Sequence, residues 1–117
     1  MKALGIDVDG AFAEYIVSPA YNIHKIGDIN FDEATFIEPL AAAINTFELS
    51  PLRKEHENIV IIGAGKLGLL ILQVAKISGR KTIVIGRSHL NYAKKLGVDI
   101  VIHSEEDYKK KIKKNNK

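Results

Sequence analysis

The 117-residue sequence contains no cysteine. A disulfide framework, a cysteine-based zinc site and a thiol nucleophile are therefore all excluded. The first ten residues also lack the basic and then apolar layout of a signal peptide, because Asp7 and Asp9 lie among them. We therefore expect a cytoplasmic protein.

No apolar run is long enough to suggest a membrane span. The longest apolar region, from Ile59 to Ala75, is interrupted by glycines, by Lys66 and by Gln73, whereas a transmembrane helix needs about 20 predominantly apolar residues. A membrane partner is not expected. With 46% hydrophobic residues in a chain of this length, one ordinary globular domain is the simplest expectation.

Excess charge of one sign is absent from most of the chain. The net charge of +3 comes entirely from the segment after His103, where six lysines accompany three acidic residues. A lysine run at a chain end is typical of a solvated helix terminus, and only Tyr108 could stack on a base there. We therefore expect no nucleic-acid partner.

The first half of the sequence reads as a connector. Short alternating runs at 13–17 and 23–25, bounded by Pro19 and Gly27, predict two short strands. Asn30 followed by Glu33 is a capping-box variant that predicts a helix start, and Pro39 predicts a second helix in which it occupies the first turn. Residues 51–58 are polar and charged, and they predict a surface loop.

From residue 58 onward, strands and helices alternate. The β-branched run at 59–62 predicts a strand buried on both faces, and an apolar helix closed by Gly79 follows it. Further strands are predicted at 82–85 and 100–102, with a short helix between them that stops at Gly97 and a last helix capped by Ser104. The order β-α-β-α-β-α predicts an α/β fold with a parallel sheet and right-handed crossovers, which is a partial Rossmann fold.

Three glycines follow the first of these strands. In a dinucleotide-binding turn the first glycine permits a tight turn, the second admits a pyrophosphate close to the backbone, and the third lets helix and strand pack closely. Gly63, Gly65 and Gly68 have this spacing, between a buried strand and an apolar helix. With the adjacent Lys66 and Leu67, they are predicted to bind the phosphates of a dinucleotide, or of its adenosine half, through backbone N–H groups.

The end of the second strand bears on the choice of cofactor. An acidic residue there would bind the ribose hydroxyls of NAD, but this sequence has Arg87 and Ser88. A guanidinium and a hydroxyl could bind a 2′-phosphate, so NADP is favoured over NAD. The alternative is that Arg87 is a solvated loop residue and the preference is mixed. His89 is expected to be a surface residue.

These motifs together resemble the medium-chain dehydrogenase/reductase superfamily, and in particular the sorbitol and threonine dehydrogenase branch of the zinc-type alcohol dehydrogenases. The resemblance covers nearly the whole chain from Asp9 onward. In that branch the glutamate matching Glu38 lies at the catalytic zinc. The matching segments are Asp9–Tyr15, Asp32–Ala34, Ile37–Leu40, Ile61–Gly68 and Ala93–Gly97.

The resemblance also implies that parts of the family's fold are missing from this sequence. In the family a GroES-like domain supplies the cysteine and histidine zinc ligands, and further strands follow the third one, so the chain is expected to be truncated at both ends. Residues 1–57 would be a remnant of the catalytic domain with linking helices, and residues 58–117 half of a Rossmann domain. A lone Glu38 cannot hold a catalytic zinc, which needs three protein ligands, so zinc is expected only if a complementary domain supplies the others. His24, His56 and His103 are interpreted as ordinary polar residues.

A missing fourth strand would leave residues 59–62 as an exposed apolar edge, open to a second copy or a complementary chain. Three functions then remain open. The first is a nucleotide-binding fragment that cannot transfer hydride alone. The second is a subunit of a split zinc-dependent alcohol dehydrogenase, and the third is a non-enzymatic nucleotide-sensing or interaction module.

Overall fold

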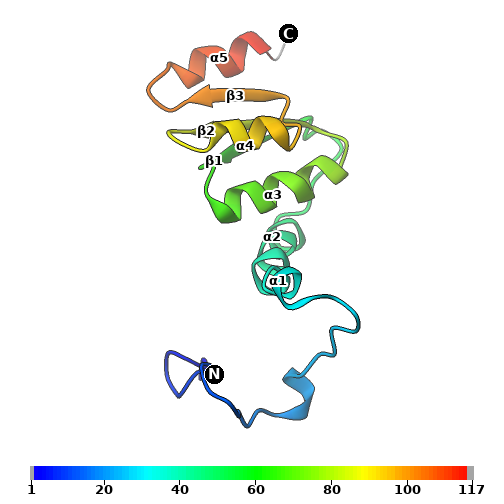
Figure 1. Cartoon of the computed structure of the whole chain (residues 1–117). Helices are drawn as coiled ribbons and strands as arrows, with labels where there is room; N and C mark the ends of the chain where they lie inside the picture. Colours follow the sequence, from blue (N-terminus) through cyan, green and yellow to red (C-terminus); the bar gives the residue numbers. More distant parts are fainter. Residues whose placement is uncertain (1, 116–117) are drawn as a thin grey trace. The chain divides into compact units, whose positions relative to one another are not determined.

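Residues 2–115 are described by a computed structural model, which divides into two units after Asn30 (Figure 1). The first unit has little regular structure: one bridge joins Leu4 and Val8, and a 3-10 turn, η1, spans Ala20–Asn22. The strands predicted at 13–17 and 23–25 are therefore wrong. A strand needs a neighbouring strand for its backbone hydrogen bonds, and within residues 2–30 neither segment has one.

The second unit begins with two helices. A single turn, α1 (Phe31–Ala34), leads into α2 (Ile37–Leu49), and Pro39 lies in the first turn of α2 as predicted. The Leu40 N–H donates to the Phe36 carbonyl at 2.9 Å, so the proline does not interrupt the helix. Ser50 ends α2.

A three-stranded parallel sheet follows, in the order β1-β2-β3. The strands are β1 (Asn58–Ile62), β2 (Lys81–Gly86) and β3 (Ile100–His103), and the helices between and after them are α3 (Lys66–Ile77), α4 (Leu90–Lys95) and α5 (Tyr108–Asn115). In the register, Ile61 lies opposite Val84, and Ile85 lies opposite Ile102. The predicted partial Rossmann fold is confirmed.

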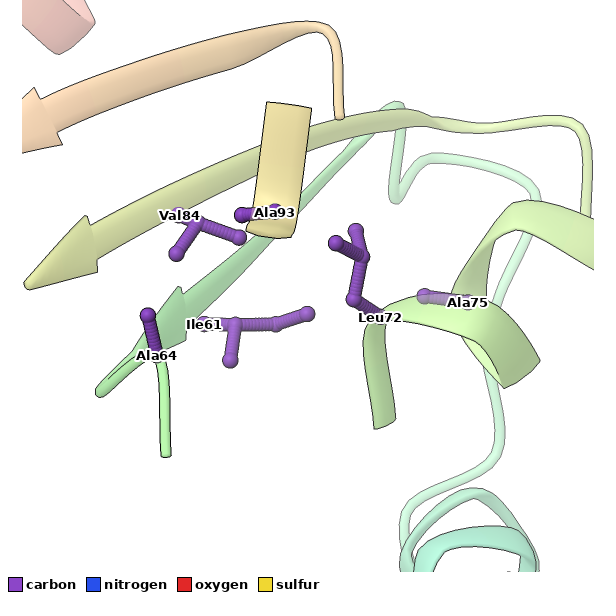
Figure 2. Close-up of a cluster of buried hydrophobic side chains, with 6 residues drawn as sticks. All are labelled: Ile61, Ala64, Leu72, Ala75, Val84 and Ala93. Carbon is purple, nitrogen blue, oxygen red and sulfur yellow. The ribbon is translucent and has the colours of Figure 1, made fainter. Parts of the chain in front are cut away.

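One face of the sheet is covered by α3 and α4. Figure 2 shows six buried side chains gathered between these helices and the strands. On the far side of α3, helix α2 packs against it, and Phe47 joins the same core. The six residues are Ile61, Ala64, Leu72, Ala75, Val84 and Ala93.

Because α2 packs on α3, the division after Asn30 places both linking helices with the sheet. The sequence-based boundary after residue 57 describes which ancestral domain each part derives from, and it stays a prediction. No helix in the described range is long and apolar enough to cross a membrane.

The opposite face of the sheet is only partly covered. A second core joins Ile83, Ile85 and Ile102 with Ile112 of α5. On β1, however, Val60 is 41% exposed and Ile62 is 83% exposed. The prediction that this strand is buried on both faces is therefore wrong, because no described helix covers β1 on this side. β1 pairs only with β2 in the part of the chain that the structure describes, so it is an edge strand as predicted.

The last helix starts later than predicted. The side chain of Asp107 accepts the Lys110 N–H at 3.1 Å, so Asp107 caps α5 and the predicted Ser104 cap is wrong. The residues before it form a turn instead, since the Glu106 N–H donates to the His103 carbonyl at 2.9 Å. The Glu106 side chain in turn accepts the His103 N–H at 2.9 Å. Of the terminal lysines, Lys117 lies outside the described residues.

Candidate nucleotide-binding site

The chain turns sharply where β1 ends at Gly63. Gly63 has a φ of +107°, a conformation that residues with a side chain rarely adopt. Its N–H donates to the Ile85 carbonyl at 2.7 Å, which ties the turn to the end of β2. The turn then delivers the chain into α3 at the carboxyl edge of the parallel sheet, where open α/β sheets bind their ligands.

Gly68 is required by close packing. A Cβ atom on Gly68 would lie 2.0 Å from the Gly63 carbonyl oxygen and 3.7 Å from the Ile61 side chain. The first turn of α3 therefore rests directly on the backbone of the glycine turn. The first and third glycines of the motif are thus explained by the fold itself.

Gly65 differs from the other two glycines. Its φ of −79° and ψ of −176° are extended values open to any residue, and a Cβ there would meet nothing within 4 Å. The fold therefore does not require glycine at this position. Gly65 is the N-cap of α3 and makes no side-chain cap hydrogen bond, so the first N–H groups of the helix lie beside a bare stretch of backbone. This is the arrangement that an anionic ligand needs to approach the helix start.

A recess of about 270 Å³ adjoins this bare backbone. Its walls come from the glycine turn, from the start of α3 and from the start of α4. The lining residues are Ala64, Gly65, Lys66, Leu69, His89 and Tyr92.

A wider, mostly apolar groove of about 770 Å³ shares Lys66, Leu69 and Tyr92 with the recess. Its other side is formed by Thr35 and Phe36, between α1 and α2, and by Pro39 in the first turn of α2. The Lys95 ammonium lies 5.7 Å from the centre of the Tyr92 ring. Lys66 and the Tyr92 ring thus lie where the two hollows meet, with the Lys95 ammonium close to that ring.

The end of β2 lies next to the glycine turn. A Cβ on Gly86 would lie 3.3 Å from the Ala64 nitrogen, so the two backbones approach closely. Arg87 and Ser88 follow, and both are exposed. Of the described residues other than glycine, only His89 has a positive φ, at 60°, and its Nδ1 lies 3.3 Å from the Ser88 hydroxyl.

Sequence reasoning missed three residues near the site. His89 and Tyr92 line the recess, and their rings lie 6.2 Å apart. His103, at the carboxyl end of β3, lies 3.1 Å through Nε2 from the Arg87 carbonyl. The position of His103 at the same edge of the sheet as the glycine turn was the signal that could have indicated it.

Beside His103, the Glu106 carboxylate binds the Lys111 ammonium and the His103 N–H. The hydrogen bond from the Lys111 ammonium, and then the one from the His103 N–H, lower the pKa of the Glu106 carboxyl below its usual value. Glu106 therefore stays ionised and holds both groups.

Glu38 is the second residue of α2, and its side chain is exposed. Within residues 2–115, no group of three histidine, aspartate or glutamate side chains lies close enough to hold a metal ion. The described residues therefore do not fit a catalytic zinc, which needs three protein ligands. A metal-binding role for Glu38 in a larger assembly stays a prediction.

The fold and the glycine turn are those of a dehydrogenase-type nucleotide-binding domain. No protein-family model matches the sequence. Among curated proteins, the L-threonine 3-dehydrogenase of Pyrococcus furiosus is 41% identical over 116 residues, which are 95% of this chain and 33% of that protein. That of Francisella philomiragia is 36% identical over 110 residues, which are 88% of this chain and 30% of that protein.

Solved structures agree with these sequence relatives. An Escherichia coli alcohol dehydrogenase in complex with NADH matches 99% of this chain, and 36% of its own, with a TM-score of 0.86 and 32% identity. The galactitol-1-phosphate dehydrogenase of Escherichia coli matches 87% of this chain, and 30% of its own, with a TM-score of 0.73 and 35% identity. Over nearly its whole length the chain is therefore similar to zinc-type members of the medium-chain dehydrogenase/reductase superfamily, as its motifs predicted. It spans about a third of the length of the curated relatives.

Proposed function

We propose that this chain binds a nicotinamide dinucleotide at the glycine turn, with the pyrophosphate over Gly65 and the start of α3. The observation that carries the proposal is the bare position of Gly65, where the fold leaves room for a side chain and the sequence supplies none. A ligand brought close to the backbone explains a glycine that neither strain nor packing requires. The similar Escherichia coli alcohol dehydrogenase is described in complex with NADH, which supports the same class of ligand.

Gly65→Ala tests this proposal. The added methyl group enters open space, so the fold should persist, while a pyrophosphate would collide with it. We expect calorimetric titration to show at least about tenfold weaker binding of NADP and NAD. Lys94→Ala, an exposed change on α4, is the control and should bind as the unmodified chain does. Absence of binding by the unmodified chain, or equal affinity in Gly65→Ala, contradicts the proposal.

For the finer choice of cofactor, we propose NADP over NAD. The exposed Arg87 and Ser88 follow β2 at the edge of the sheet where the glycine turn lies, and no carboxylate stands at either position to repel a 2′-phosphate. Arg87→Asp should weaken NADP binding more than NAD binding, and adenosine 2′,5′-bisphosphate should lose affinity in parallel. If the ratio of the two dissociation constants is unchanged, Arg87 is a solvated residue that does not contact the 2′-phosphate.

Hydride transfer is not proposed for this chain alone, because its described residues hold no zinc ligand set. The dehydrogenase activity in the names of its relatives belongs to proteins about three times as long. The uncovered β1 favours a second candidate function, in which the chain is one subunit of a split dehydrogenase and pairs with a complementary chain along β1. Appearance of alcohol oxidation on mixing with a zinc-domain chain, absent from either chain alone, would support it.

A further inference from the structure

His103 links the end of β3 to the segment that carries Arg87 and Ser88. Its Nε2 lies 3.1 Å from the Arg87 carbonyl oxygen. A carbonyl oxygen only accepts, so Nε2 carries the proton. Nδ1 lies 3.5 Å from the Glu105 N–H. Both ring nitrogens therefore have a contact, and the two contacts define the orientation of the ring.

The backbone of His103 is also fixed. Its N–H donates to the Glu106 carboxylate at 2.9 Å, and that carboxylate also binds the Lys111 ammonium. In the sheet, His103 lies opposite Gly86, and the Ser104 N–H donates to the Gly86 carbonyl at 3.0 Å. The imidazole therefore extends from a rigid strand end toward the first residue after β2.

The hydrogen bond from His103 to the Arg87 carbonyl restrains the loop after β2, and not β2 itself. The backbone already joins the two strand ends through Gly86, so the ring contact adds its constraint one residue further along, at the Arg87 peptide. Gly86 is buried, whereas Arg87 and Ser88, the next two residues, are exposed. A fixed Arg87 peptide limits the directions in which the guanidinium can point, and a bidentate contact to phosphate depends on that direction.

We propose that His103 is a positioning residue for cofactor discrimination: it holds the Arg87 peptide so that the Arg87 side chain meets the 2′-phosphate of NADP. This role rests on the proposed function. His103 ends β3, whereas Arg87 follows β2, 16 positions earlier in the sequence. Because His103 does not touch the nucleotide in this role, its removal should change the preference for NADP without abolishing dinucleotide binding.

Three variants of His103 distinguish a positioning role from a contribution to the stability of the fold alone. His103→Phe keeps a ring but has no donor, whereas His103→Gln places an amide N–H near the position of Nε2, and His103→Asn carries the same amide too short to reach Arg87. We expect the phenylalanine and asparagine variants to lose about fivefold to tenfold in NADP affinity, the effect of one lost hydrogen bond, with a smaller change for NAD. The glutamine variant should recover most of the NADP preference.

Calorimetric titration gives the two affinities, and the ¹⁵N–¹H spectrum reports the loop independently of any nucleotide. The Arg87 and Ser88 amide signals should move in His103→Phe and return in His103→Gln. If the ratio of NADP to NAD affinity is unchanged in His103→Phe, whether both affinities stay the same or both fall equally, the role of His103 is overturned while the proposed function stays intact. Failure of the unmodified chain to bind either cofactor would overturn both.

Discussion

Asp99 accepts two hydrogen bonds from Thr82, one from its backbone N–H and one from its hydroxyl, each at 2.7 Å to Oδ2. Thr82 is fully buried at the start of β2, and the Lys76 ammonium lies 3.1 Å from the same carboxylate oxygen. The side chain of Asp99 thus joins α3, β2 and the segment before β3. It does so at the amino ends of the strands, away from the glycine turn.

Replacement of Asp99 by alanine should therefore destabilise the fold. Two donors of a buried threonine would lose their acceptor, which costs about 1–3 kcal/mol per unsatisfied group. Lys76→Ala, which removes only a partly exposed ion pair, should cost at most about 1 kcal/mol. Urea unfolding followed by circular dichroism measures both values. Equal losses in the two variants would show that the contacts to Thr82 contribute little.

Acid should weaken this same junction. The hydrogen bonds from the Thr82 side chain and then its N–H lower the pKa of Asp99 from 3.8 to about 2. A carboxyl whose folded pKa lies below its unfolded value stabilises the fold above the unfolded pKa and loses that contribution as pH falls through the folded one. The stability difference between the unmodified chain and Asp99→Asn should therefore be constant above about pH 5 and shrink toward pH 2. A difference independent of pH, in urea titrations at fixed ionic strength, contradicts this assignment.

Much of the sheet could be predicted because its signals are local. The β-branched run at 82–85 and the helix stops at Gly79 and Gly97 depend on neighbours in sequence, and the structure places both strand and helix ends there. The predicted strands at 13–17 and 23–25 failed because alternation alone provides no pairing partner. Burial of both faces of β1 failed because it depends on which elements cover Val60 and Ile62, and residue patterns do not show that.

The site was predictable where one motif contains all its parts. Gly63 and Gly68 contact each other within six residues, so spacing alone indicated their roles. The contact between His103 and Arg87 depends on the register of β3 against β2, which is a tertiary property. The Ser104 cap failed for a related reason, since the Glu106 side chain binds the His103 N–H and holds residues 103–106 in a turn.

Gly65 and Gly68 should respond differently to substitution by alanine. Gly68→Ala places a methyl group on the Gly63 carbonyl and should cost about 1–3 kcal/mol or more, as overpacking does. Gly65→Ala should cost at most about 1 kcal/mol, since alanine is only a poorer N-cap than glycine. Thermal unfolding of the two variants compares them directly. A Gly65→Ala variant that unfolds as readily as Gly68→Ala would mean that Gly65 serves the fold.

The outer edge of β1, beside which no further strand lies in the described range, should make the chain associate at high concentration. Asn58–Ile62 contains no charged residue or proline to discourage pairing, and Ile62 is 83% exposed. Ile62→Lys should reduce self-association while changing the free energy of unfolding by at most about 0.5 kcal/mol, because the side chain is already in water. Sedimentation velocity over a range of concentrations measures the association.

Ile77→Lys provides the matched control for that experiment. Ile77 is 86% exposed at the end of α3, so the substitution adds the same charge to an equally exposed isoleucine outside the sheet. If association proceeds through β1, only Ile62→Lys should shift the chain toward the monomer, because a lysine on an edge strand opposes pairing while one on α3 only raises the net charge. If the two lysines reduce association equally, the reduction comes from the added net charge and not from β1. If the unmodified chain is a monomer at every concentration, pairing through this edge is ruled out.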